Sequence, residues 1–176
     1  MARRILIKGT SGAGKSTLAR QLAVRLELPR IELDALHHGP HWTAASEAEL
    51  RARVTSVLDD ARGWVIDGNY DNKLGTLLWD RAELIVWLDV PLLTKLLRLL
   101  WRTSRRLVLG EELWNGNRES LKEAFWGRDA LFPWAVRSHF RQRKLWPRLL
   151  EQRPHVRLTT ATEVGAWLSA VRATLE

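Results

Sequence analysis

The glycine-rich segment at residues 9–17 constrains the fold of this chain more than any other feature. It satisfies the pattern G-x-x-x-x-G-K-[ST] and directly follows the apolar residues 5–7. The glycines let backbone N–H groups curl around phosphate oxygens, the lysine supplies a cation, and the serine hydroxyl can bind Mg²⁺. The nine residues are Gly9, Thr10, Ser11, Gly12, Ala13, Gly14, Lys15, Ser16 and Thr17. This pattern predicts a loop between a strand and a helix that binds the phosphates of a nucleoside triphosphate.

The composition narrows the class of protein. The chain has 176 residues, a usual size for one domain with a full core, and it has no cysteine, which excludes disulfides and thiolate metal sites. The first apolar stretch, residues 5–7, is too short for a signal peptide or a membrane span. We therefore expect a single cytoplasmic domain spanning residues 1–176, with no membrane partner, as a monomer or homodimer.

The positive charge is concentrated in one part of the sequence. The formal net charge is +8, and residues 95–148 contain 13 Lys and Arg against 5 Asp and Glu. Such a surface attracts phosphates, nucleic acid or anionic membranes, and charge alone does not distinguish among them.

Strand and helix patterns alternate along the chain. We predict strands at residues 3–8, 30–33, 64–68, 83–88 and 155–159, and helices at 15–27, 46–61, 91–109, 133–152 and 160–173. Capping-box signatures, Ser46-x-x-Glu49 and Thr160-x-x-Glu163, open two of these helices. The order predicts a three-layer α/β fold, a parallel five-stranded sheet with helices on both faces, whose ligands bind at the carboxyl ends of the strands.

Acidic residues end several predicted strands, and two of them are candidates for the carboxylate that holds Mg²⁺ with Ser16. Asp67 is the first choice because Gly68 follows it and allows close approach to the loop; Asp89 is the rival.

Phosphoryl transfer also needs arginines over the loop. On the predicted helix 91–109, Arg98 and Arg102, together with Arg105 and Arg106, lie largely on one side. Leu96, Leu97 and Leu100 would then face the core, although a solvated basic face or a membrane-surface helix has the same pattern.

The end of the second predicted strand is a candidate acceptor site. Asp34 could orient or deprotonate a hydroxyl there, although a helix-capping role remains open. The string Asp34-x-x-His37-His38-x-x-His41 is also compatible with a metal site. Asn69 and Tyr70, just after Gly68, could contact the acceptor by hydrogen bonds and stacking.

Four strings together resemble the adenylate kinase-like P-loop kinases of the DNA topology modulation group. They are the loop at residues 9–17, Leu33-Asp34-Ala35-Leu36 followed by Trp42, Trp64-Val65-Ile66-Asp67-Gly68-Asn69-Tyr70, and Val86-Trp87-Leu88-Asp89-Val90-Pro91. The similarity implies a nucleotide kinase-like P-loop NTPase fold with a helical lid at about residues 103–128. It also implies that Arg98 flanks the base of ATP and that Arg102 contacts its phosphates. Adenylate kinases have Phe-Pro-Arg where this chain has Asn69-Tyr70-Asp71, so AMP is not carried over as the acceptor.

Two functions follow as hypotheses. The first is an enzyme, an ATP- and Mg²⁺-dependent kinase that transfers the γ-phosphate to a nucleotide, nucleoside or small metabolite. Lys15, Asp34, Arg98 and Arg102 would be its catalytic residues, Ser16 and Asp67 its metal ligands, and Asp34, Asn69 and Tyr70 its acceptor contacts. The second is an ATP-binding regulator of nucleic acid that does not turn over. We favour the kinase because no nucleic-acid-binding signature accompanies the basic residues, and a lid accounts for the same charge.

Overall fold

The first strand, β1 (Arg4–Lys8), shows how the sequence builds the two sides of the core. Its side chains alternate between the faces of the sheet, and all four from residue 5 to residue 8 are buried. Ile5 and Ile7 pack into one apolar cluster, while Leu6 packs into another. A strand buried on both faces is typical of the centre of a parallel sheet.

A computed structural model describes residues 2–60, 62–117 and 130–173. Within them, one parallel sheet has the strand order β2-β3-β1-β4-β5. The other strands are β2 (Arg30–Glu32), β3 (Trp64–Asp67), β4 (Leu84–Leu88) and β5 (His155–Leu158). Their carboxyl ends share one edge, so the residues that follow β1, β2 and β3 come together there. The predicted five-stranded parallel α/β fold is confirmed.

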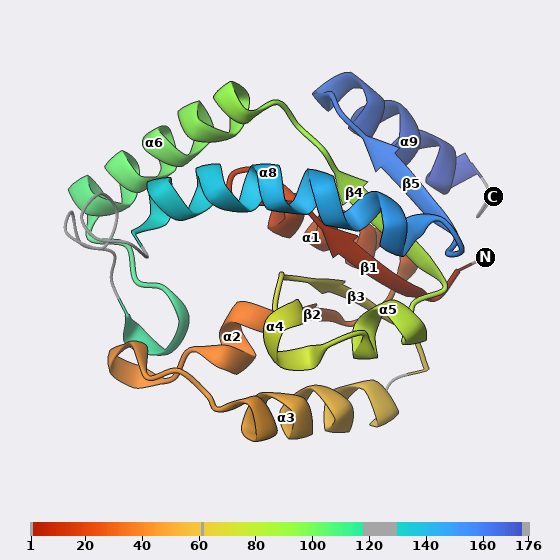
Figure 1. Cartoon of the computed structure of the whole chain (residues 1–176), viewed down its shortest axis with the longest axis horizontal. Helices are drawn as coiled ribbons and strands as arrows, with labels where there is room; N and C mark the ends of the chain where they lie inside the picture. Colours follow the sequence, from red (N-terminus) through yellow and green to blue (C-terminus); the bar gives the residue numbers. More distant parts are fainter. Residues whose placement is uncertain (1, 61, 118–129, 174–176) are drawn as a thin grey trace.

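Helices cover both faces of the sheet (Figure 1). α1 (Lys15–Leu26) and α9 (Ala161–Ala173) pack on the face that carries Ile5 and Ile7. The opposite face packs against α3 (Glu47–Asp60), α5 (Leu77–Arg81) and α8 (Leu131–Leu150). The remaining helices in the described residues are α2 (Leu33–His37), α4 (Asp71–Leu74), α6 (Leu92–Leu109) and the 3₁₀ turns η1 (Pro40–Trp42) and η2 (Trp114–Gly116).

Both predicted capping boxes form. The backbone N–H of Glu49 donates to Ser46 Oγ at 3.2 Å, and the Ser46 N–H donates to the Glu49 carboxylate at 2.8 Å. At α9, the Glu163 N–H donates to Thr160 Oγ1 at 3.1 Å. These bonds satisfy N–H groups that the first turn of a helix leaves unpaired, so they fix where the helices begin.

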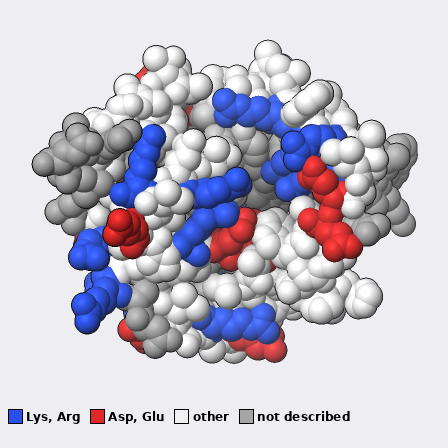
Figure 2. Space-filling model, turned by 180° about the vertical axis from the view of Figure 1, so that it is seen from behind, with Lys and Arg blue, Asp and Glu red and all other residues white. Residues whose placement is uncertain are grey.

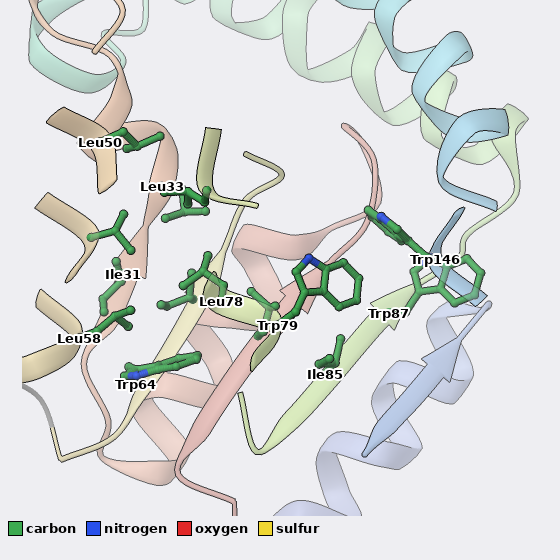
Figure 3. Close-up of a cluster of buried hydrophobic side chains, with 14 of the residues drawn as sticks. Ile31, Leu33, Leu50, Leu58, Trp64, Leu78, Trp79, Ile85, Trp87 and Trp146 are labelled. Atoms are coloured by element: carbon green, nitrogen blue, oxygen red, sulfur yellow. The ribbon is translucent and has the colours of Figure 1, made fainter. Parts of the chain in front are cut away.

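Tryptophans supply much of the core on the α8 side (Figure 3). Trp146, from α8, meets Trp79 and Trp87 edge to face, with ring centroids 6.1 and 5.9 Å apart. Trp64 is also buried, whereas Trp101 on α6 is 73% exposed. The large rings fill the wide space between the sheet and α8 with few side chains.

Three short helices, α2, α4 and α5, were not predicted. Each has four or five residues, too few to show a helical period in the sequence. α8 begins at Leu131, two residues before Pro133, because proline is tolerated in the first turn.

The predicted orientation of α6 was wrong. Leu97 and Leu100 are 58% and 46% exposed, while Lys95, Leu99 and Thr103 form the buried row of the helix. The inward row packs against the glycine-rich loop, where the carbonyl oxygen of Lys95 would lie 2.5 Å from a side chain added at Gly12. Lys95 can face inward because His139 on α8 supplies a partner for its ammonium, at 2.7 Å.

The predicted lid lies partly outside the described residues. Residues 103–109 continue α6 without a break, and residues 110–117 contain η2. Residues 118–128 of the predicted lid are not described.

Candidate active site

The glycine-rich loop lies between β1 and α1, as the motif requires. Gly14 is the N-cap of α1, with φ 98°, and Gly12 has φ 79°. Both are left-handed conformations that glycine adopts without strain. The loop therefore directs the amino end of α1, where backbone N–H groups are unpaired, towards the space above the sheet.

Lys15 lies over this loop. Its Nζ donates to the carbonyl oxygen of Thr10 at 3.2 Å. Burial lowers the pKa of Lys15 below its usual value, and the negative charges of Asp34 and Asp67 oppose this shift. Arg102 and Lys8 lower the pKa further. The structure thus brings Asp34, Asp67 and Arg102, all predicted site residues, within electrostatic reach of Lys15.

Ser16 and Asp67 contact each other directly, although 51 positions separate them in the sequence. Ser16 Oγ donates to Asp67 Oδ2 at 2.6 Å. The second oxygen of Asp67, Oδ1, is buried and accepts no hydrogen bond from the described residues, and Arg30 Nε lies 3.4 Å from it. A buried carboxylate oxygen without a hydrogen bond, beside a serine hydroxyl, fits the hard oxygen ligands that Mg²⁺ prefers.

The rival carboxylate, Asp89, has other partners. Arg143 on α8 donates to both its oxygens at 2.8 and 3.1 Å, and Arg157 on β5 also donates to it. Burial would raise the pKa of Asp89, but the hydrogen bonds from these arginines hold it below its usual value. Asp89 therefore ties β4 to α8 and β5, which leaves Asp67 as the carboxylate that contacts Ser16.

Asp34 and Tyr70 are brought together at the carboxyl ends of β2 and β3. The Tyr70 hydroxyl donates to Asp34 Oδ1 at 2.7 Å and lies 3.3 Å from His38 Nε2. Burial and the charge of Asp34 raise the pKa of Tyr70 above its usual value, so the phenol stays a donor. Asp34 lies in the first turn of α2. This network holds Asp34 within electrostatic reach of Lys15, and its predicted role at an acceptor stays a prediction.

Asn69 contacts the loop. Its Nδ2 donates to the carbonyl oxygen of Gly9 at 2.6 Å. The contact that the structure shows is thus with the first residue of the motif, and the predicted contact of Asn69 with an acceptor stays a prediction.

Arg98 and Arg102 project from α6 towards the same loop. Arg98 Nη1 lies 3.4 Å from the carbonyl oxygen of Ala13, and Arg102 acts electrostatically on Lys15. Further along the helix, Arg105 and Arg106 form ion pairs with Glu111 at 2.7 and 3.9 Å. Lys and Arg side chains gather around a hollow on the face of the molecule seen in Figure 2. Arg98 and Arg102 thus bring positive charge close to the phosphate loop.

The histidine metal site is not supported. Within residues 2–60, 62–117 and 130–173, the structure holds no group of three or more His, Cys, Asp or Glu that could bind a metal ion. Instead, His37 packs against His38 and Tyr70, with ring centroids 4.7 and 4.6 Å away. Burial lowers the pKa of His37 to about 4. The pattern of histidines in the sequence reflects aromatic packing.

Lys8 is a residue that sequence reasoning missed. It is fully buried, yet its Nζ donates to Asp71 at 2.7 Å and to the carbonyl oxygen of Gly68 at 3.3 Å. The ammonium also lies 5.0 and 5.5 Å from the ring centroids of Trp79 and Trp146. The signal was present, because a lysine at the end of an apolar central strand has to find a partner.

None of the helices in the described residues is long and apolar enough to cross a bilayer. No protein-family model matches the chain, and no curated protein matches its sequence.

Solved structures nevertheless share its fold. The deoxyadenosine kinase from M. mycoides with bound dATP has a TM-score of 0.59 at 13% identity, covering 98% of each chain. Shikimate kinase from Acinetobacter baumannii, in complex with shikimate, has a TM-score of 0.57 at 17% identity, covering 98% of this chain and 93% of that one. Shikimate kinase from Bacteroides thetaiotaomicron has a TM-score of 0.55 at 18% identity, covering 99% of both chains. The chain therefore has the fold of the P-loop small-molecule kinases.

Proposed function

We propose that this chain is an ATP-dependent phosphotransferase that moves the γ-phosphate of ATP to a small acceptor, a nucleotide, nucleoside or other metabolite. The observation that carries the proposal is the contact of Ser16 with Asp67 beside Lys15, at 2.6 Å, with Asp34 near enough to act on the pKa of Lys15. These contacts support the proposal, because they bring the loop, a candidate metal ligand and a candidate acceptor carboxylate to one edge of the sheet. P-loop phosphotransferases need these three parts together.

Each side chain has a role in this proposal. Lys15, Arg98 and Arg102 stabilise the negative charge of the transferring phosphoryl group. Ser16 and Asp67 would hold Mg²⁺, which supplies further neutralisation of the β- and γ-phosphates. Asp34, held by Tyr70, orients the acceptor and takes its proton.

We further propose that the chain forms one domain over residues 1–176 and closes over ATP with a lid at about residues 103–128. Arg98 and Arg102 on α6 support this proposal, because they lie close to the phosphate loop. The four sequence strings described above support membership of the DNA topology modulation group.

The test is a Lys15→Ala variant assayed for phosphorylated product with ATP, Mg²⁺ and a panel of nucleoside monophosphates, nucleosides and small metabolites. We expect at least a hundredfold loss of transfer, as on removal of other transition-state cations. Lys144→Ala, an exposed lysine on α8, is the control and should behave as wild type. Transfer that survives in Lys15→Ala would refute the proposal.

The second candidate, a regulator of nucleic acid, is supported by exposed cations on α8, among them Arg141, Lys144 and Arg148. A gel-shift titration at two salt concentrations separates the two. Binding through several phosphate contacts falls by orders of magnitude between low and moderate ionic strength, whereas ATP held in a preformed loop weakens much less.

A further inference from the structure

The acceptor side of the site is built from segments that are far apart in the sequence. Asn117 Nδ2 donates to the carbonyl oxygen of Gly39 at 2.9 Å, and its Oδ1 accepts from the Trp42 N–H at 2.8 Å. The stretch around η2 thereby lies against η1 and α2 (Figure 1). We call the residues 32–45, 68–76 and 113–117 the acceptor corner.

In the described part of the chain, the few cations that reach the acceptor corner are engaged by other groups. Lys73 is the single Lys or Arg in its three segments, and its ammonium donates to the carbonyl oxygen of Ala45. Arg30, on β2, forms ion pairs with Glu32 and Asp67. Arg53, on α3, also reaches the corner, where it donates to the carbonyl oxygen of Leu36 at 2.8 Å. Arg98, on α6, lies instead beside the phosphate loop, where a triphosphate would neutralise it.

The corner contains three histidines, and burial disfavours the charged form of two of them, His37 and His38. Burial lowers the pKa of His37 to about 4, and burial also lowers the pKa of His38. The His37 ring is therefore neutral at physiological pH, and burial favours the neutral form of His38 as well. Phosphate and carboxylate groups of ligands are bound by Arg, Lys or protonated His in almost all specific sites, because a desolvated anion needs charged donors.

The corner instead presents a carboxylate and aromatic rings. Asp34 accepts from Tyr70 through Oδ1. The His38 ring lies edge-on to Trp42, at 5.2 Å, and stacks on Trp114, at 6.1 Å. Trp42 and Trp114 are half-buried, so part of each ring faces solvent. A carboxylate accepts a hydrogen bond from a hydroxyl and repels an anion, and aromatic faces bind uncharged rings.

We infer that the acceptor is an uncharged polyhydroxyl compound that is phosphorylated on a hydroxyl, either a nucleoside or a neutral sugar, and that a phosphate- or carboxylate-bearing acceptor is rejected. This inference rests on the proposed function. In the step, the acceptor oxygen forms a bond to the γ-phosphorus of ATP and the bond from that phosphorus to the β,γ-bridging oxygen breaks. The hydroxyl proton passes to Asp34, and the products are ADP and a phosphomonoester.

The experiment uses acceptors in pairs that differ mainly in charge. Each nucleoside is compared with its 5′-monophosphate, and each neutral aldose with the corresponding sugar acid, in the presence of ATP and Mg²⁺. Phosphorus NMR distinguishes a phosphomonoester product from a new diphosphate, and from the inorganic phosphate of hydrolysis. Product formation with the nucleosides or with the aldoses shows which of these two classes of neutral compound is the acceptor.

We expect the neutral member of the productive pair to have at least a tenfold higher kcat/KM. A higher kcat/KM for the charged member overturns the inference and leaves the kinase proposal standing. Hydrolysis of ATP alone across the whole panel overturns both.

Asp34→Asn tests the source of the discrimination. It should lower kcat for the neutral acceptor and move the ratio of kcat/KM between the two members towards one, because it removes the repelling charge. Tyr70→Phe is the matched control: it removes the hydrogen bond but keeps the carboxylate, so the ratio should stay within about threefold of wild type. An unchanged ratio in Asp34→Asn contradicts the role assigned to Asp34.

Discussion

The ammonium of Lys8 and the carboxylate of Asp71 form an ion pair of 2.7 Å in which the two side chains are very unequally buried, at 1% and 36% exposure. The pair joins the last residue of β1 to the first residue of α4. Asn69, two residues before Asp71 in the chain, donates to the carbonyl oxygen of Gly9. The turn that carries Tyr70 is therefore fixed to the start of the phosphate loop at two points, which couples the donor and acceptor sides of the site.

Because the two side chains are unequally buried, their substitution should lower the free energy of unfolding by unequal amounts. Asp71→Asn leaves the Lys8 ammonium buried without a counter-charge, while Asn can still accept from Trp79 Nε1. We expect a loss of about 3 kcal/mol in the free energy of unfolding. Lys8→Met keeps an apolar chain under the two tryptophan rings and leaves a carboxylate that water can reach, so the loss should be nearer to about 1 kcal/mol. Urea unfolding measures both, and equal losses would contradict the argument.

Substitution of Asp67 should lower turnover, whereas substitution of Asp89 should lower stability. Asp67→Asn removes the proposed metal ligand, so we expect at least a hundredfold loss of turnover and a higher Mg²⁺ requirement, with little change in stability. Asp89→Asn should instead cost about 2 kcal/mol of stability, because Arg143 and Arg157 lose a buried partner. Turnover titrated with Mg²⁺ and urea unfolding separate the two. Wild-type Mg²⁺ dependence in Asp67→Asn would show that the metal is held elsewhere.

Asn69→Ala should act on ATP more than on the acceptor. The variant removes the hydrogen bond to the Gly9 carbonyl oxygen and loosens the first residue of the loop. We expect a rise of roughly fivefold in the KM for ATP, corresponding to one ordinary hydrogen bond, and an unchanged KM for the acceptor. Asn72→Ala, at an exposed position on α4, is the matched control. A rise confined to the acceptor KM would mean that Asn69 contacts the acceptor.

Stability should depend on pH through His37. Its pKa falls from 6.5 to about 4, mainly because of burial and with help from Lys73 and His38, while Asp34 opposes the shift. Between these values the unfolded chain binds a proton that the folded chain does not. The contribution of neutral His37 to the free energy of unfolding is therefore complete above about pH 6.5. It is lost as the pH falls through about 4, by at most about 3 kcal/mol.

His37→Phe keeps a ring beside Tyr70 but cannot titrate. We expect the free energy of unfolding of this variant to fall less between pH 7 and pH 4.5 than that of the wild type. Urea unfolding at the two pH values gives the difference, and parallel pH profiles would rule out His37 as the titrating group.

The local parts of this protein follow from its sequence. The glycine-rich loop, the five strands and both capping boxes depend on residues within a few positions of each other, so their patterns are visible in the chain. The same holds for the fold class, because the alternation of strands and helices leaves few ways to cover a parallel sheet.

Contacts between residues distant in the chain determine the role of side chains that look alike in the sequence. Asp67 and Asp89 both end a strand and look alike in sequence. Ser16 contacts Asp67, whereas arginines 54 and 68 positions away neutralise Asp89.

The sequence of α6 shows an amphipathic helix without saying which side is inward. A helical period defines two faces, whereas their direction depends on neighbours such as the loop at Gly12 and His139, whose Nδ1 lies 2.7 Å from Lys95 Nζ. The sequence determined the phosphate loop and its scaffold, and only the tertiary structure decided which charges surround it, because pairing of buried charges joins residues that are distant in the chain.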